Sequence, residues 1–276
     1  MAMSIRTNVS SLNAQRNLSS TQGALDTSLS RLSSGYRITK AGDDAAGLGI
    51  STKLEAQIRS YAQAVRNAND GMSVIQSSEA ALNESANVLT RLRELAMQSA
   101  SDGIGDTERG YVQKEASKLV DELERIAQVT EYNGTKLLNN GASSLDFQVG
   151  VMNSTNDRIS FTTIDATTGA SGLAVTGLSL AGKVSAQSAL TTIDDALKKV
   201  SDARAELGAA GNRFQSAINN IQAFSESLSA ANSRIKDVDV AEETSRMARS
   251  QILSQAGVSV LAQANQAPQL ALKLLG

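Results

Sequence analysis

The sequence predicts a mainly α-helical protein: long heptad-patterned helices form a rod-shaped bundle with a small β-hairpin region, and the terminal helices pair as a coiled coil. Apolar residues recur at alternating steps of three and four over long stretches, which is typical of narrow helix seams. Of the 276 residues 41% are hydrophobic, yet only 3% are aromatic and none is Trp. This composition favours thin helical layers over a thick core built around large rings.

Residues 4–35 and 238–275 have helical patterns with more apolar residues than one pair of helices can bury. At about 25 cal/mol per Å², such exposed stripes carry a substantial penalty. The ends should therefore be paired in an assembly, or disordered until they are assembled. A closed core within the chain is the alternative interpretation. The predicted assembly residues are Ile5, Val9, Leu12, Leu25, Leu29, Leu32, Leu261, Leu270, Leu272, Leu274 and Leu275.

The stretch KAGDDAAGLGIST at residues 40–52 is predicted to be a joint between helices. A phosphate-binding loop is disfavoured, because GLG gives only part of a GxGxxG motif and two Asp side chains would repel phosphate. Two adjacent Asp residues also point to different faces, so they do not converge on one bond as an acid–base pair must. Either Asp can instead cap the next helix. The residues of this predicted inter-domain joint are Gly35, Gly42, Asp43, Asp44 and Gly47.

Three heptad seams, over residues 54–89, 112–126 and 193–235, predict three central helices that pack against one another. Glu79 is the one charged residue that interrupts the first seam. At 1.5 Å per residue, the two longer helices would each extend roughly 60 to 70 Å. The turn signal SDGIGDTERG separates the first two helices, and YNGTKLLNNG ends the second.

Residues 142–187 are predicted to be the β-containing and most exposed part. Apolar residues alternate with polar or small ones at 145–151 and at 159–161, and the linking MNSTND suits a hairpin. Three predicted domains follow. They are a terminal coiled-coil domain (1–46 and 237–276), a central helical rod (47–141 and 188–236) and a short variable surface segment (142–187).

The composition removes the usual parts of an active site. The chain has no Cys and no His, so it lacks the commonest general base and the commonest zinc ligands. We therefore predict no catalytic, cofactor-binding or metal site, and a protein that is not an enzyme. The net charge of -2 indicates neither a nucleic acid nor an anionic membrane as partner. The amino terminus has no apolar signal-peptide core, which leaves export by a dedicated machine.

Several local sequences closely resemble bacterial flagellin. They are MSIRTNVSSLNAQRNL, SLSRLSSGYRI, AGDDAAGLGIS, RNANDGMSVIQSSEAALNE, RLRELAMQSA, YNGTKLL and the carboxyl-terminal MARSQILSQAGVSVLAQANQAPQLALKLLG. The resemblance covers both terminal thirds of the chain. Residues 142–187 resemble nothing particular and are short, which suggests a flagellin without large outer domains.

The resemblance implies a structural subunit that self-assembles into the bacterial flagellar filament, the helical propeller for swimming, secreted to the extracellular flagellum. The terminal helices would line the inner tube of the filament and the three heptad helices would form the next layer. The implied partners are further copies of the chain, the flagellar export apparatus, an export chaperone and the cap protein. The alternatives are a hook-filament junction protein and, more distantly, a coiled-coil signalling rod.

The resemblance also implies a contact with Toll-like receptor 5, the vertebrate sensor. Within RLRELAMQS and QKEA, the matching positions are Arg91, Leu95 and Glu115. Thr90 departs from the Gln that often precedes this arginine in the family. The alternative for Arg91 and Glu115 is that they are ordinary solvated helix residues or salt-bridge partners between subunits.

Overall fold

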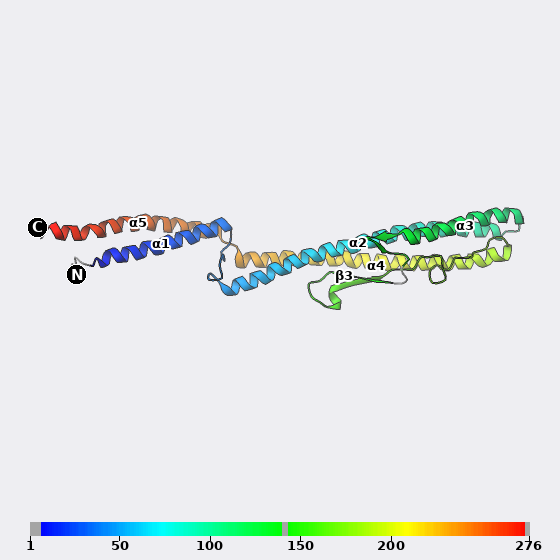
Figure 1. The fold of residues 1–276 in the computed structure, drawn as a ribbon, viewed down its shortest axis with the longest axis horizontal. Coiled ribbons are helices and arrows are strands. Elements are labelled where there is room, and N and C mark those ends of the chain that lie inside the picture. The colour runs from blue at the N-terminus through cyan, green and yellow to red at the C-terminus, as the bar shows by residue number, and fades with distance from the viewer. Residues whose placement is uncertain (1–6, 140–142, 274–276) are drawn as a thin grey trace. The chain divides into compact units, whose positions relative to one another are not determined.

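The computed structural model describes residues 7–139 and 143–273, with side-chain surroundings up to residue 266. Five α-helices account for most of the described chain (Figure 1). They are α1 (Val9–Ser34), α2 (Ala45–Ala100), α3 (Asp106–Val129), α4 (Lys183–Lys236) and α5 (Val240–Lys273). The predicted mainly α fold with long helices is thus confirmed.

The chain divides into two compact units. Unit 1 consists of Met1–Ile58 and Glu226–Gly276, and unit 2 of Arg59–Ser225. The boundaries lie within α2 and α4, whereas the sequence placed them near residues 46 and 237. No turn signal marks the structural boundaries, because both helices continue through them with unbroken hydrogen bonding.

The core of unit 2 lies between α2, α3 and α4, as the three seams predict. Leu82 and Leu89 of α2, Leu123 of α3 and Phe214 of α4 are fully buried there. Glu79 stays at the edge of the seam, where its carboxylate lies 3.7 Å from the Arg204 guanidinium. An ion pair at the edge avoids the cost of burying an unpaired charge.

Two antiparallel hairpins belong to unit 2. β1 (Glu131–Tyr132) and β2 (Thr135–Lys136) are joined by Asn133 and Gly134, with φ of 48° and 78°. Positive φ at both residues is the signature of a type I′ turn, which Asn-Gly favours. The sequence predicts only a turn that ends a helix there, and it does not reveal the hairpin because the strands are only two residues long.

The predicted β-hairpin at residues 145–161 is confirmed. β3 (Ser144–Gln148) pairs with β4 (Arg158–Thr162), and the connection contains a 3-10 turn, η1 (Thr155–Asp157). In this register Leu145 faces Phe161 and Phe147 faces Ile159. The Phe147 ring also meets the ring of Phe214 edge-on at 5.7 Å, which fixes the hairpin on α4.

Residues 142–187, predicted to be the most exposed part of the chain, contain buried side chains in the segment after β4. Leu173, Val175 and Leu180 are at most 1% exposed. The segment folds on itself, since the Leu173 amide donates to the Thr167 carbonyl at 2.8 Å. These few apolar side chains are spaced along a Gly-, Ser- and Thr-rich sequence, so no periodic pattern reveals that they enter the core.

Candidate assembly surface

Unit 1 contains a pair of antiparallel helices, α1 and α5. Among the described residues, three side-chain hydrogen bonds join them. The Asn8 side-chain amide donates to the Ala264 carbonyl at 2.8 Å. The Ser11 hydroxyl donates to the Asn265 side-chain oxygen at 2.8 Å, and the Ser28 hydroxyl donates to the Glu243 carboxylate at 2.6 Å. Residues 8 and 11 at the start of α1 lie opposite residues 264 and 265 of α5, and residue 28 lies opposite residue 243, so the two helices run in opposite directions. The predicted pairing of the terminal helices is therefore present within one chain.

This helix pair leaves much of its apolar surface uncovered. Only Ala14 and Ser28 of α1 are buried. On both helices, large aliphatic side chains are more than half exposed: Val9, Leu12, Leu29, Val240, Ile252, Leu253, Val258 and Val260. The described residues show no closed core here, in contrast to unit 2. Many exposed aliphatic side chains on one pair of helices are typical of an association site.

The predicted assembly residues are distributed over this surface. Val9, Leu12 and Leu29 have 59%, 51% and 51% of their surface exposed. Leu25, Leu32 and Leu261 are partly exposed. Leu270 and Leu272 belong to α5, but their side-chain surroundings are not described. Ile5, Leu274 and Leu275 lie outside the described residues.

Five exposed residues of this surface were not selected by sequence reasoning, although each is more than half exposed: Val240, Ile252, Leu253, Val258 and Val260. The signal that could have identified them is the absence of a single stripe in α5. At about 100° per residue, apolar residues at 252, 253, 258 and 260 fall on more than one face. A helix that is apolar on several faces needs neighbours on several sides.

The joint after α1 is built as a compact turn. Gly35 ends α1 with φ of 75° and donates its amide to the Arg31 carbonyl at 2.9 Å. Asp43 accepts from the Thr39 and Lys40 amides, each at 3.0 Å. These hydrogen bonds lower the pKa of the Asp43 carboxyl, because they stabilise its charged form, and the bond from the Thr39 amide has the largest effect.

Asp44, and not Asp43, caps α2. Its carboxylate accepts from the Gly47 amide at 2.8 Å, which satisfies one free donor of the first turn. Gly47 is buried, and a Cβ there would lie 2.8 Å from Cδ1 of Ile38. Gly42 has open space around the position of a Cβ. Of the predicted joint glycines, Gly35 is thus required by its backbone conformation and Gly47 by close packing.

The three predicted receptor residues lie in unit 2, on α2 and α3. The Arg91 guanidinium donates to Glu115 at 2.9 Å and to Glu94 at 2.9 Å. These hydrogen bonds raise the pKa of Arg91, and the bond to Glu115 has the largest effect. Arg91 and Glu115 are about half exposed in their side chains. Leu95 is only 2% exposed and belongs to the core.

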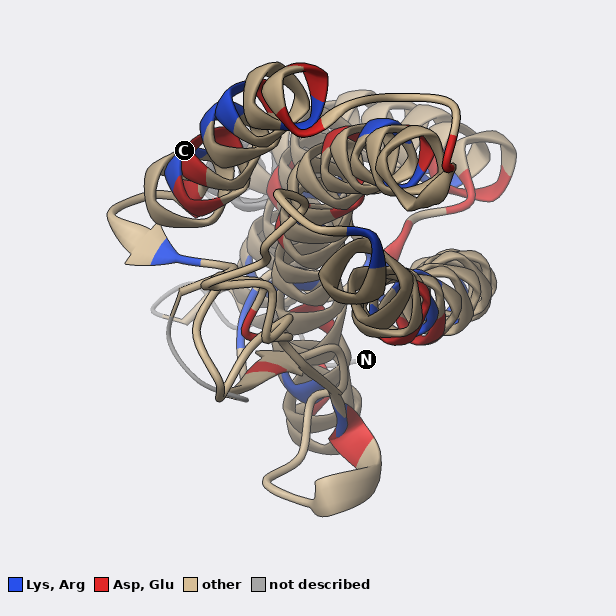
Figure 2. Ribbon diagram, turned by 90° about the vertical axis from the view of Figure 1, so that its right-hand side faces the viewer, with Lys and Arg blue, Asp and Glu red and all other residues tan. Residues whose placement is uncertain are grey.

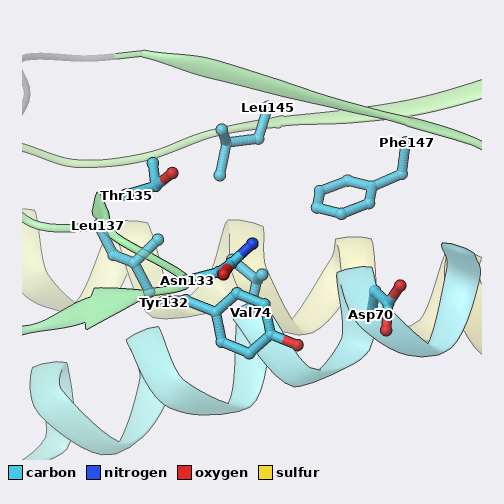
Figure 3. Close-up of a pocket in the computed structure, with 8 residues that line it drawn as sticks. All are labelled: Asp70, Val74, Tyr132, Asn133, Thr135, Leu137, Leu145 and Phe147. Carbon is cyan, nitrogen blue, oxygen red and sulfur yellow. The ribbon is translucent and has the colours of Figure 1, made fainter.

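A cleft of about 680 Å³ in unit 2 lies between α2, the β1–β2 hairpin and β3 (Figure 3). Tyr132, Leu145 and Phe147 supply apolar surface, and Asp70 adds a carboxylate. Among the described residues, no group of His, Cys, Asp and Glu side chains is arranged to hold a metal ion. The cleft therefore offers one acidic group beside apolar surface, without the convergent set that acid–base chemistry needs.

Charges of both signs are interspersed along the helices (Figure 2). Several pair across the helices of unit 2, as Arg93 of α2 does with Asp194 of α4 at 2.7 Å. Within the described ranges, no helix is both long and apolar enough to cross a membrane.

Family models match both ends of the chain. Residues 5–143 match the bacterial flagellin N-terminal helical region, and residues 190–275 match the bacterial flagellin C-terminal helical region. A flagellin of Halalkalibacterium halodurans is 42% identical over 273 residues, covering 99% of this chain and 100% of that protein. Flagellin B of Vibrio anguillarum is 36% identical, with full coverage of both chains. The latter alignment extends over 376 positions, so that relative carries additional residues.

Solved structures agree with these matches. A crystal structure of Bacillus cereus flagellin has 30% identity and a TM-score of 0.51, covering 56% of this chain and 88% of that one. A putative flagellar hook-associated protein from Vibrio parahaemolyticus has a TM-score of 0.60 over 71% of this chain and 100% of that one. At 14% identity, this second likeness shows a shared fold alone. The chain therefore belongs to the bacterial flagellin family, whose members are the structural subunits of the flagellar filament.

Proposed function

We propose that this subunit polymerises through the apolar faces of α1 and α5. The observation that carries the proposal is the set of eight large aliphatic side chains on these helices that are more than half exposed. Burying one such side chain contributes about 1.5–3 kcal/mol, so contacts with several neighbours would stabilise the added subunit strongly. Because surfaces on several sides of the helix pair are apolar, contacts of the heterologous, non-closing kind would extend into a filament.

The terminal segments 1–46 and 237–276 form the inner layer in this proposal. Segments 47–141 and 188–236 form the next layer, and the tip of the β3–β4 hairpin faces outward. Support for the outward tip comes from Met152, which is 67% exposed within the connection. The joint of Gly35, Gly42, Asp43, Asp44 and Gly47 links the two layers, and its capped turn gives the chain a defined path between them.

The proposal is tested by deleting residues 238–276. The shortened chain should not polymerise, while its circular dichroism should keep the helical signal of α2, α3 and α4. The matched variant lacks residues 151–154 in the β3–β4 connection, and it should still form filaments. Filaments from the chain without residues 238–276 would contradict the proposal.

Secretion is the second part of the proposed function. The subunit leaves the cell through the flagellar export apparatus, with a chaperone that holds residues 238–276 and a cap protein that receives the chain at the filament tip. Exposed apolar side chains such as Ile252 and Leu253 give a chaperone a surface to cover before assembly. Cells with an inactive export apparatus should retain the subunit, and its appearance in their medium would contradict this route.

The third part is recognition by Toll-like receptor 5. Arg91 and Glu115 offer an exposed, ion-paired patch, and the buried Leu95 holds α2 in place beneath it. Arg91→Asp should lower receptor signalling at least tenfold, on the order of the loss of one close interfacial charge pair. Arg93→Asp is the control, because Arg93 pairs with Asp194 instead. Equal signalling by Arg91→Asp and the unsubstituted chain would remove this assignment.

A further inference from the structure

Glu243 is a buried charged residue within the helix pair of α1 and α5. It is 4% exposed, on a surface where most side chains of both helices face solvent. Its carboxylate accepts a hydrogen bond from the Ser28 hydroxyl at 2.6 Å. A carboxylate at this depth is tolerated only where donors and cations compensate the lost hydration.

The compensation comes from both helices. The Arg31 guanidinium of α1 lies 3.8 Å from Glu243, and the Arg246 guanidinium of α5 lies 3.7 Å from it. Arg31 also lies 3.8 Å from Asp43 in the joint. Ser28 and Arg31 are neighbours on one face of α1, since residues three apart lie side by side on a helix. Only one register of α5 against α1 places Glu243 opposite both.

We infer that Glu243 sets the register in which α1 and α5 pair, as a specificity-determining residue for assembly. Leucine-rich seams alone specify register weakly, since a shift of one heptad again places apolar residues against apolar residues. A shift of seven residues moves α5 by about 10 Å along α1. It would take Glu243 away from Ser28 and Arg31 and leave its carboxylate with only Arg246 of its own helix, which is unfavourable for a buried charge.

A competing constraint lies at one end of the pair. The Arg37 amide donates to the Lys236 carbonyl at 2.7 Å, and the Val238 amide to the Gly35 carbonyl at 3.0 Å. These backbone bonds alone would fix the register if the short connection into α5 were rigid. The experiment must therefore separate the side-chain cluster around Glu243 from the backbone bridge.

The register can be read from engineered disulfides, because the chain has no Cys. A Cβ on Gly257 would lie 3.8 Å from Cβ of Leu18, which is the usual Cβ separation of a disulfide. The pair Leu18→Cys with Gly257→Cys therefore reports the register of the structure. Leu18→Cys with Ser250→Cys, or with Ala264→Cys, reports a shift of one heptad in either direction.

Each pair is placed in the full chain, polymerised under reducing conditions, oxidised and dissociated. The fraction of chains with an internal disulfide is then measured by mass spectrometry. With Glu243 present, the Leu18–Gly257 pair should form about tenfold more internal disulfide than either shifted pair, because the buried carboxylate loses Ser28 and Arg31 in the shifted registers. With Glu243→Leu, the disulfide yield of the shifted pairs should rise to within about threefold of the yield of the Leu18–Gly257 pair, since an apolar side chain no longer opposes the shift.

Glu242→Leu is the matched control, because Glu242 is adjacent but exposed and pairs with Arg246 on its own helix. It should keep the disulfide pattern of the unsubstituted chain. If Glu243→Leu prevents polymerisation, Ser28→Ala takes its place, since it removes the hydroxyl donor across the helices. An unchanged pattern in the polymerised variant overturns the inference and assigns the register to the backbone bridge.

The inference rests on the proposed pairing of the terminal helices in the filament, and the two can fail separately. Polymerisation without residues 238–276 would overturn the proposed function. The other outcome concerns only Glu243. If filaments need residues 238–276, and the chain with Glu243 forms the shifted disulfides as readily as the Leu18–Gly257 disulfide, the role of Glu243 is overturned and the proposed function stands.

Discussion

At the scale of residues, small side chains set how closely the elements of unit 2 approach. Gly71 of α2 lies under the ring of Phe214, and a Cβ there would be 2.7 Å from the end of that ring. Phe214 is fully buried, so it has little room to move. Gly208 of α4 is also inside a helix, but a Cβ there would meet nothing within 4 Å.

Gly71→Ala should therefore lower the free energy of unfolding by about 1–3 kcal/mol, as overpacked cores do. Gly208→Ala should raise it by about 0.5–1 kcal/mol, because alanine restricts the unfolded chain more than glycine. Urea denaturation of the purified chain, followed by circular dichroism, measures both values. Equal effects of the two substitutions would contradict the packing at Phe214.

Glu124 of α3 holds the segment after β4. Its carboxylate accepts from the Thr168 amide and the Thr168 hydroxyl, each at 2.8 Å. These hydrogen bonds lower the pKa of Glu124 below its ordinary value of 4.5, and the bond from the Thr168 backbone amide has the largest effect. The resulting stability is present above pH 4.5 and is lost as the pH falls through the lowered pKa.

Glu124→Gln should cost about 1 kcal/mol at pH 7, since the charged acceptor is lost. It should also reduce the loss of stability on acidification below about pH 4.5, because Gln takes up no proton. Unfolding free energies between pH 7 and pH 3 measure this difference. Glu206→Gln, at an exposed position of α4, is the control. If Glu124→Gln loses more unfolding free energy between pH 7 and pH 3 than Glu206→Gln does, the stabilising role of the Glu124 carboxylate is contradicted.

At the scale of elements, the long helices of unit 2 could be predicted because their heptad seams repeat over many turns, with Glu79 as the one charged interruption of the first seam. Phe224 continues the pattern, yet it is 54% exposed. Its ring lies against Tyr61 at 6.3 Å between centroids, near the end of unit 2. Periodicity indicates which face is apolar, but it does not indicate where the partner helices diverge.

The short elements were harder to predict, for different physical reasons. The β1–β2 hairpin depends on positive φ at Asn133 and Gly134, and the Asn-Gly pair was available as a signal. The burial of Leu173 and Val175 depends on hydrogen bonds between distant segments, which no local pattern encodes. The same holds for the hydrogen bond between Ser28 and Glu243, whose partners lie 215 residues apart.

The terminal helices, α1 and α5, should differ in local stability from the central helices, α2, α3 and α4. α1 and α5 bury little surface, whereas α2, α3 and α4 share a continuous core. In the monomer, amide hydrogens of α1 and α5 should exchange much faster than those around Leu82 and Leu123. In filaments, exchange in α1 and α5 should slow at least tenfold, since polymerisation covers their apolar faces. Equal protection of α1 in monomer and filament would contradict this account.

At the scale of the whole molecule, the sequence predicts the kind of protein better than its internal boundaries. Heptad seams and surplus apolar residues at both ends predict a protein that assembles through its terminal helices. The limits of the compact units, near residues 58 and 225, lie inside continuous helices. Such a limit depends on which other helices are in contact, and the sequence of one helix does not contain that information.

Polymerisation should depend on single exposed side chains of the terminal helices. Leu29→Asp places a charge where 51% of the side chain is exposed, so the monomer should fold as before. It should block polymerisation, because a buried unpaired carboxylate costs more than the contact contributes. Met152→Asp, at a position 67% exposed in the β3–β4 connection, should polymerise normally. Light scattering of the seeded proteins compares the two variants.

The most direct measurement of the central claim is negative-stain electron microscopy of the purified chain after addition of short sheared filament seeds or a precipitating salt. Assembly through the open apolar faces of α1 and α5 predicts long filaments of uniform width from the unsubstituted chain. Persistent monomers or closed short rings under all these conditions would contradict it, and would mean that the apolar terminal faces pack in another way.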